Sequence, residues 1–198
     1  MVAGTIAAVI LAGGQGRRMG GTDKAMLGLA GRPLFSHVAG RIGPQVAALA
    51  ISANGDPLRF APLPVLADPP ERRGEGPLAG VLSGLDWAAA QGMDLLLTVP
   101  TDTPFLPRDL VARLDEAGGG TEIAIAASAG RAHPSVALWP LAERDRIAAL
   151  FAAGERRLRM AAPGAREVAF DATPDPFMNL NSPEDLRTAE ALLDAGAP

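Results

Sequence analysis

The sequence predicts an α/β fold: a three-layer α/β/α sandwich around a mostly parallel, Rossmann-like sheet, formed by one domain over residues 1–198. The first reason is that short apolar runs alternate with segments of helical pattern, which is typical of parallel sheets covered on both faces. The second reason is the unit at residues 5–52, where two apolar runs flank a helical segment and the right-handed crossover makes the two strands parallel. The length also suits one core.

Composition limits the functions that the chain can have. The net charge is −4, the sequence pI is about 5.2 and no long basic run occurs, so a nucleic-acid-binding surface has little support. Cysteine is absent, which excludes disulfides, thiolate catalysis and zinc-thiolate sites. No cationic segment precedes the first apolar run and no run is long enough to cross a membrane, so we expect a cytoplasmic protein without membrane contact.

The first strand, predicted over residues 5–11, is short, uniformly apolar and ended by glycines. It leads into a loop with five glycines and three cations, namely Gly13, Gly14, Gly16, Gly20 and Gly21 with Arg17, Arg18 and Lys24. Glycine lets backbone N–H groups approach phosphate oxygens, and the cations offset the phosphate charge. Because the Walker and dinucleotide-binding fingerprints both fail here, the loop is interpreted as a phosphate site of another class. The alternative is a glycine-rich surface turn.

The remaining elements alternate in the same way. A short extended piece at 25–29 is followed by a turn, and Pro33 opens a helix that runs to about residue 42. The most apolar strand, at 93–99, is placed at the centre of the sheet. The other expected elements are strands at 46–52 and 64–67, helices at 77–91 and 107–116, strands at 122–127 and 131–139 that form a hairpin or neighbouring pair at the far edge, an amphipathic helix at 141–153, a strand at 166–170, and a last helix capped by Ser182 that runs to about residue 195.

Polar residues stand where several predicted strands end. Ser52 and Asn54 follow one strand, Asp68 follows another and Asp102 follows the central one. Ligands of open α/β sheets bind at the carboxyl ends of strands, so Ser52 and Asn54 are candidates to contact a base or a ribose. If the central strand neighbours the first, Asp102 lies beside the glycine loop, as a magnesium ion that bridges triphosphate oxygens requires. The alternative role of Asp102 is to cap the next helix.

The loop sequence LAGGQGRRMGG-x-DK resembles the nucleotidyltransferase signature, L-A-G/A-G-x-G/A/S-x-R-M followed by a lysine. It is most similar to the molybdopterin guanylyltransferase version, in which the double arginine, MGG and DK occur together. Further motifs resemble that branch: GPLAG at 76–80, D-T-P at 102–104, H-P at 133–134, GERR at 154–157 and N-x-N-S-P-E at 179–184. The resemblance covers residues 11–186 and implies a fold like that of the nucleotide-diphospho-sugar transferases.

The resemblance implies which residues bind ligands and which take part in the reaction. The implied catalytic residues are Arg18, Lys24 and Asp102, and Asp102 is also the implied metal ligand. The implied binding residues are Leu11, Ala12, Gly13, Gly14, Gly21, Lys24, Ser52, Asn54, Asp68, Gly80, Asp102, Arg156, Asn179 and Asn181.

Several of these assignments have structural alternatives. By resemblance, Asp68 contacts the nucleoside part of GTP, and Arg156 holds the phosphate or the pterin of a second substrate. The structural alternative for Asp68 is an aspartate that starts a loop, and the alternative for Arg156 is a residue of a solvated helix start. The alternative for Gly80 is tight packing against the first strand. The histidines, His37 and His133, are interpreted as structural.

By this resemblance, the reaction transfers GMP from GTP to the terminal phosphate of molybdopterin that bears molybdenum, with release of pyrophosphate. A phosphate monoester is already anionic near neutral pH and attacks the α-phosphorus without a general base. This agrees with a sequence in which no Ser-His-Asp or paired-carboxylate arrangement is visible. Mg²⁺, Arg18 and Lys24 would offset the charge of the departing pyrophosphate.

Other functions stay open from the sequence. A cytidylyltransferase acting on the same pterin usually has alanine where this chain has Gly13, and a sugar-phosphate nucleotidyltransferase shares the loop signature. A nucleotide-binding regulator without chemistry belongs to a different class. GTP and molybdenum-molybdopterin are the expected small-molecule partners, and proteins that insert molybdenum or mature molybdoenzymes are the expected transient protein partners.

Overall fold

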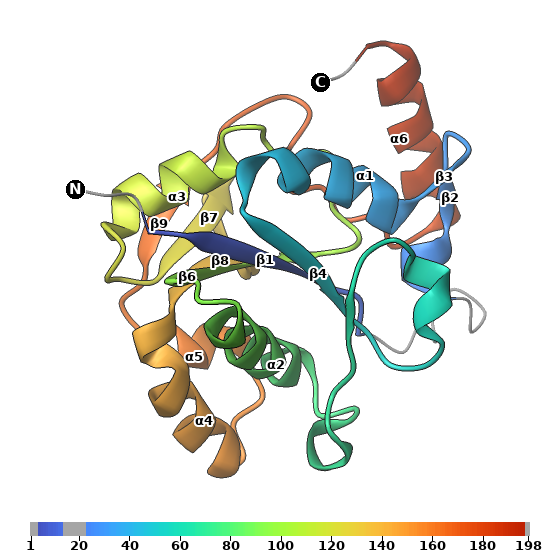
Figure 1. The fold of residues 1–198 in the computed structure, drawn as a ribbon. Helices are drawn as coiled ribbons and strands as arrows, with labels where there is room; N and C mark the ends of the chain where they lie inside the picture. Colours follow the sequence, from blue (N-terminus) through green and yellow to red (C-terminus); the bar gives the residue numbers. More distant parts are fainter. Residues whose placement is uncertain (1–3, 14–22, 197–198) are drawn as a thin grey trace.

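The computed structural model describes residues 4–13 and 23–196, which build a seven-stranded sheet of order β5-β4-β1-β6-β8-β7-β9 (Figure 1). Six strands run in one direction, and β8 is antiparallel to both of its neighbours, β6 and β7. The mostly parallel sheet is therefore confirmed, with β6 at its centre as predicted. The strands are β1 (Ile6–Leu11), β4 (Ala48–Ser52), β5 (Val65–Leu66), β6 (Leu95–Pro100), β7 (Ala124–Ser128), β8 (Arg131–Pro140) and β9 (Arg166–Ala169).

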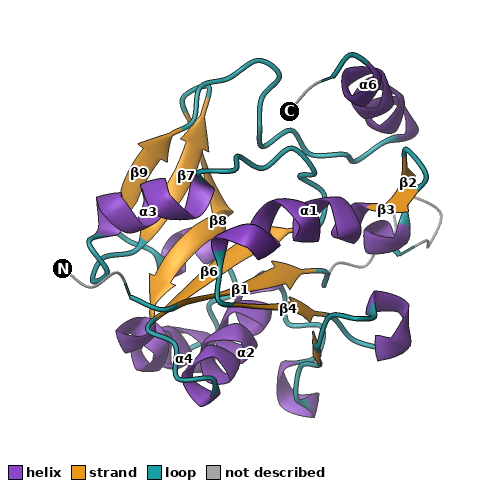
Figure 2. Cartoon of the chain, turned by 45° about the horizontal axis from the view of Figure 1, so that its top comes forward, coloured by secondary structure: helices purple, strands orange, loops and turns teal. Residues whose placement is uncertain are grey.

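Helices cover both faces of this sheet, which confirms the three-layer arrangement. Helices α1 and α3 lie on one face, and α2, α4 and α5 lie on the other (Figure 1). Helix α6 stands to one side, against the small hairpin of β2 and β3 (Figure 2). None of the helices described by the structure is long and apolar enough to cross a membrane. The bounds are α1 (Leu34–Ile42), α2 (Pro77–Ala90), α3 (Leu110–Gly118), α4 (Arg144–Ala152), α5 (Leu158–Ala161), α6 (Pro183–Asp194), β2 (Gly28–Leu29) and β3 (Arg32–Pro33), with 3-10 helices at Lys24–Met26, Gly43–Gln45, Pro57–Phe60, Pro70–Arg72 and Leu141–Glu143.

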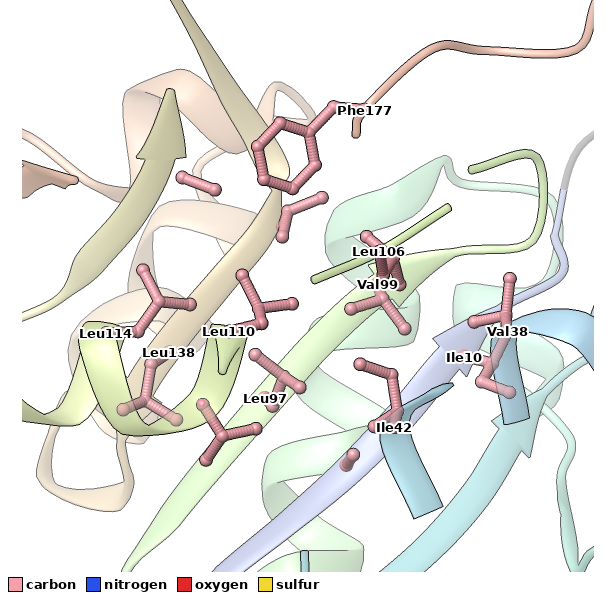
Figure 3. Close-up of a cluster of buried hydrophobic side chains, with 14 of the residues drawn as sticks. Ile10, Val38, Ile42, Leu97, Val99, Leu106, Leu110, Leu114, Leu138 and Phe177 are labelled. Carbon is pink, nitrogen blue, oxygen red and sulfur yellow. The ribbon is translucent and has the colours of Figure 1, made fainter. Parts of the chain in front are cut away.

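The first strand is apolar throughout because both of its faces are buried. Ala8 and Ile10 belong to the core beneath α1 and α3, whereas Ala7 and Val9 belong to the core on the α2 side. All four residues have no exposed surface. Figure 3 shows the first of these cores, in which sheet residues meet helix residues, among them Ile10, Val38, Ile42, Leu97, Val99 and Leu110.

One predicted helix begins later than expected. Helix α3 begins at Leu110, three residues beyond the predicted start at residue 107, because the side chain of Gln45 organises its first turn. The Gln45 amide accepts a hydrogen bond from the Val111 N–H at 3.0 Å and donates one to the Pro107 carbonyl at 3.0 Å. The N-cap position is Asp109, so the alternative role of Asp102 as a helix cap is wrong.

The placement of the hairpin at the far edge is also wrong in one respect. Strands β7 and β8 do form an antiparallel hairpin, but β8 lies inside the sheet against the central β6. The edge is formed by β9, which pairs in parallel with β7. The order differs because residues 131–140 form one long strand that bridges β6 and β7, leaving the free side of β7 for the later β9.

Candidate active site

The carboxyl ends of β4, β1 and β6 lie side by side. Leu11 is aligned with Ser52 of β4 and with Pro100 of β6. The backbone N–H of Ala12 donates to the Ser52 carbonyl at 2.9 Å, which extends this alignment past the end of β1. The chain that leaves β1 and the turn that carries Asp102 therefore start from adjacent positions at this edge, as the sequence predicted.

Three side chains from distant parts of the chain meet at this edge. The Lys24 ammonium donates to Asp102 Oδ2 at 2.5 Å and to Asn181 Oδ1 at 2.5 Å. Lys24 opens a 3-10 helix whose first turn is capped by Asp23, Asp102 follows β6, and Asn181 precedes α6. The backbone N–H of Leu180 also donates to the Asp102 carbonyl at 2.9 Å, which fixes the segment before α6 against the turn after β6. The cluster thus joins one cation to a carboxylate and an amide.

The second carboxylate oxygen of Asp102 is buried and has no hydrogen-bond donor among the described residues. A buried charged oxygen without a donor is costly, so such an atom usually serves a ligand or an ion. The described residues hold no group of three or more His, Cys, Asp or Glu side chains that could bind a metal by themselves. A hard cation bound at Asp102 would therefore take its other oxygens from water or substrate, a coordination that is common for Mg²⁺.

Asn54 and Asp68, both predicted to face the nucleoside, hold each other in position by hydrogen bonds. The Asn54 amide donates to Asp68 Oδ2 at 3.0 Å and accepts from the Asp68 backbone N–H at 3.1 Å. Ser83 on α2 donates to the other oxygen, Oδ1, at 3.2 Å, and Asp68 is only 9% exposed. Both carboxylate oxygens of Asp68 are thus used within the protein, Oδ2 by Asn54 and Oδ1 by Ser83. A direct contact of Asp68 with a nucleoside stays a prediction.

Comparison with known proteins agrees with this geometry. The family model of the MobA-like NTP transferase domain matches residues 8–167, most of the sheet. This chain belongs to that family. A protein of Cereibacter sphaeroides named molybdenum cofactor guanylyltransferase is 57% identical over 191 residues, 93% of this chain and 95% of the relative. A protein of the same name from Rhodobacter capsulatus is 56% identical over 194 residues, 98% of this chain and 99% of the relative.

Solved structures show the same fold at lower identity. Molybdopterin-guanine dinucleotide biosynthesis protein A from Archaeoglobus fulgidus superposes with a TM-score of 0.72 at 21% identity, over 96% of this chain and all of that one. The 2-C-methyl-D-erythritol 4-phosphate cytidylyltransferase of Thermus thermophilus gives a TM-score of 0.66 at 21% identity, over 94% of this chain and 98% of that one. At these identities the likeness concerns the fold alone.

In this MobA-like chain, Gly80 is explained by packing. A Cβ atom at Gly80 would lie 2.9 Å from Leu11 Cδ2 and 2.9 Å from Ser52 Oγ, too close for either neighbour. Gly80 therefore lets α2 approach the ends of β1 and β4, which is the structural alternative given by the sequence. Ser52 is 4% exposed and lies against this same point of α2. The contacts of Gly80 and Ser52 with a ligand stay predictions.

Gly13 differs from Gly80 in its surroundings. Gly13 is exposed, and a Cβ atom there would meet no described atom within 4 Å. Packing among the described residues therefore does not require glycine at this position. Ala12, between Leu11 and Gly13, is half-buried at the mouth of the loop. Three other predicted residues of the loop, Gly14, Arg18 and Gly21, lie outside the described residues.

Arg156 lies beside the start of α2. Its Nε is 2.7 Å from Glu75 Oε2, and its guanidinium stacks on the Phe151 ring at 3.9 Å. No contact among the described residues joins it to Lys24 or Asp102. Both the ligand-binding and the structural interpretation of Arg156 therefore stay open, although its guanidinium already pairs with Glu75. Asn179 is half-buried and makes no side-chain hydrogen bond with the described residues, so only Asn181 of the two predicted amides joins the Lys24 cluster.

Sequence reasoning missed Arg59, which connects two parts of the site. Its guanidinium donates to the Asn54 carbonyl at 2.6 Å and lies 2.8 Å from Asp23 Oδ2, and it stacks on Phe60 at 4.7 Å. Asp23 in turn caps the turn that presents Lys24. Arg59 therefore couples the position of Lys24 to that of Asn54. Nothing in the local sequence PLRF signals this, because both partners come from other segments.

His133 takes part in a hydrogen-bond network within the protein. Its Nε2 is 2.8 Å from Ser128 Oγ, which donates to Asp175 Oδ1 at 2.8 Å, and its ring packs on Phe177 at 4.8 Å. Burial lowers the pKa of His133, an effect that the Asp175 charge opposes. The network fastens the segment leading to Asn181 onto the sheet. His37 is also structural, since its Nε2 lies 2.8 Å from the Leu29 carbonyl.

Proposed function

We propose that this protein transfers GMP from GTP to the terminal phosphate of molybdenum-molybdopterin, releasing pyrophosphate and forming the guanine dinucleotide cofactor. The observation that carries the proposal is the Lys24 ammonium, held between Asp102 and Asn181 at the strand edge where nucleotides bind in this fold class. The substrate assignment is supported by relatives at 56% and 57% identity that are named molybdenum cofactor guanylyltransferase.

In this reaction the protein has mainly to position the two substrates and to neutralise the charge of the triphosphate. An oxygen of the pterin phosphate attacks the α-phosphorus of GTP, and the bond from that phosphorus to the bridging oxygen of the β-phosphate breaks. Pyrophosphate leaves with the electron pair. Because a phosphate monoester carries about −1.5 to −2 charge at pH 7, no side chain has to remove a proton. Lys24, together with Arg18, neutralises charge on the triphosphate, and Asn181 holds the Lys24 ammonium in place.

Magnesium dependence is the second part of the proposal. The donor set fits the ion, because Asp102 offers one buried oxygen that has no donor among the described residues, and Mg²⁺ is usually held by one or two carboxylates together with phosphates and water. Asp102 is the residue that would hold it. Bound there, Mg²⁺ would supply positive charge to the triphosphate oxygens.

The choice of GTP over CTP has support at Gly13. Its exposed position leaves space where a methyl group would stand, and packing among the described residues does not account for that space. A larger purine base can use it. A nucleotide-binding regulator without turnover is less well supported, because Lys24 and Asp102 are both present and in contact.

One assay tests these alternatives. Pyrophosphate release is measured with molybdenum-molybdopterin and GTP, with CTP in place of GTP, and with Mg²⁺ omitted. Release with GTP and Mg²⁺ is expected, with little release in the other two conditions. Release with CTP at an equal rate would contradict the base assignment, and binding of GTP without any release would favour the regulator.

The cellular setting completes the proposal. A cytoplasmic location is supported by the absence of cysteine from the sequence. Transient contacts with proteins that insert molybdenum and mature molybdoenzymes follow from the reaction, because its pterin substrate and its dinucleotide product both have to be handed between proteins.

A further inference from the structure

A cavity of about 340 Å³ lies between the end of α1, the start of α3 and the segment 170–176. Its volume falls in the range of small-molecule sites. It does not include Lys24, Asp102 or Asn181, so it is separate from the cluster described above. Its lining residues are Arg41, Phe105, Pro107, Arg108, Asp109, Arg113, Phe170, Asp171, Ala172, Thr173, Pro174 and Pro176.

Two of the three arginines that line the cavity pair with no anionic side chain in the part of the chain that the structure describes. Arg113 is engaged, since it stacks on Phe170 at 3.9 Å, donates to the Ala169 carbonyl and lies 3.8 Å from Asp109. Arg41 and Arg108 make no ion pair and no side-chain hydrogen bond with the described residues, although Asp171 also lines the cavity.

Arg41 and Arg108 are close enough for the charge of one to affect the other. The pKa of Arg41 is lowered by its partial burial and by the positive charge of Arg108. Two neighbouring guanidinium groups that make no ion pair with the described residues repel each other, although Asp109 and Asp171 also line the cavity. An anion placed between them would relieve that repulsion.

Much of the remaining cavity wall is apolar, although Asp109, Asp171 and Thr173 also line it. Phe105 is 6% exposed and Phe170 is 3% exposed, so both rings are built into the core and are fixed in position. Prolines at 107, 174 and 176 complete a rigid surface. The position of α3 at the rim is held by Gln45 at one side and by Arg113 at the other. The cavity is thus preformed, with a cationic side and an apolar side.

We propose that this cavity binds a small phosphate monoester with an apolar or aromatic body. The phosphate lies between Arg41 and Arg108, and the body fills the space beside Phe105 and Phe170. A monoester dianion can pair with both guanidinium groups, and the planar fork of arginine suits its oxygens. The proposal is that this site is separate from the site of guanylyl transfer; none of its lining residues belongs to the Lys24 cluster.

Isothermal titration calorimetry with three probes tests the proposal. Phenyl phosphate has both the phosphate group and the aromatic ring, inorganic phosphate has the phosphate alone, and phenol has the ring alone. The titrations use the full chain with Lys24→Ala, which weakens phosphate binding at the strand edge. Phenyl phosphate is expected to bind more tightly than either single-part probe, and its affinity is expected to fall at high salt.

Variants of Arg41 and Arg108 locate the binding. In the same background, Arg41→Gln and Arg108→Gln should each weaken phenyl phosphate binding by about tenfold or more, the scale of a lost hydrogen bond to a charged group. The matched control is Arg187→Gln, an exposed arginine of α6 without an ion pair among the described residues, which should bind as the parent does. Thermal melting confirms that each variant is folded.

Several results would overturn the proposal. They are no binding of phenyl phosphate at about 10 mM, equal affinity in parent and arginine variants, or equal affinity for phenyl phosphate and inorganic phosphate. With Lys24 restored, Arg108→Gln should leave the KM for molybdopterin unchanged. A raised KM would mean that the cavity is part of the substrate site. This result would contradict the proposal of a separate site but not the proposed guanylyl transfer.

Discussion

The Lys24 ammonium lies 2.5 Å from Asp102 Oδ2, although 78 residues separate the two in sequence. Their side chains are only 22% and 18% exposed, so the pair is partly shielded from water. The pair lies at the edge of the sheet where the carboxyl ends of β1 and β6 are aligned. In the proposed reaction, the triphosphate meets both partners at once, and each of them can be tested alone.

The first prediction concerns Asp102. Asp102→Ala should lower Mg²⁺-dependent pyrophosphate release by at least ~100-fold, because charge stabilisation in the transition state is lost. Folding should be kept, since a partly exposed ion pair contributes about 1 kcal/mol or less. The release assay and a thermal melt measure both quantities. Asp194→Ala, at the exposed end of α6, is the control. An unchanged rate in Asp102→Ala would refute the metal role.

The second prediction concerns GTP binding at Lys24. Lys24→Ala should weaken GTP binding by about 1.5–3 kcal/mol, the scale of a charge-assisted hydrogen bond. Lys24→Arg keeps the charge but not the shape, so it should recover part of the affinity. Calorimetric titration with GTP gives the comparison. If all three proteins bind GTP equally, Lys24 does not contact the nucleotide.

The third prediction concerns two glycines in helices. Gly80→Ala should destabilise the protein by about 1–3 kcal/mol, because its Cβ would meet Leu11 and Ser52 at 2.9 Å. Gly40→Ala on α1 is the matched control, since nothing lies within 4 Å of its Cβ. It should stabilise the protein by about 0.5–1 kcal/mol. Urea unfolding measures both changes, and a neutral Gly80→Ala would show that α2 can move away without cost.

The fourth prediction concerns Arg59 as a positioning residue. Arg59→Gln removes the ion pair with Asp23, so the geometry between Lys24 and Asn54 should loosen. We expect the KM for GTP to rise about 3- to 10-fold while kcat changes less, the scale of one ion pair of about 1 kcal/mol. Arg73→Gln, an exposed arginine without an ion pair among the described residues, should behave as the parent does. An unchanged KM in Arg59→Gln would mean that Asp23 and Asn54 hold their positions without it.

The fifth prediction concerns pH and His133. Burial lowers the pKa of His133 below its usual 6.5, so the unfolded chain binds a proton more readily than the folded one. The stability contributed by the neutral ring is fully present above pH 6.5 and is lost as pH falls through the lower folded pKa. Urea unfolding of the parent at pH 7.5 and 5.5 should show this loss, and His133→Gln should reduce it. His37→Gln is the control, and an equal pH dependence in all three proteins would exclude His133 as its source.

Much of the fold could be predicted from local patterns. Strands β1 and β6 were recognisable because burial on both faces requires an unbroken apolar run. The start of α6 was recognisable because Ser182 and Asp185 form a reciprocal capping box, a local interaction that the structure confirms. Boundaries were less accurate where a distant side chain decides them, as Gln45 does for α3.

The sequence by itself determined the layered α/β fold, the family and the presence of Lys24 and Asp102 at one edge, because these follow from apolar periodicity, parallel crossovers and short motifs. Only the tertiary structure decided that Asn181 joins Lys24, that Asp68 holds Asn54, that Arg59 links Asp23 to Asn54, and that β9 forms the edge. The physical reason is that a polar contact depends on the spatial position of single atoms. Two segments far apart in sequence can therefore meet without leaving any periodic pattern in either one.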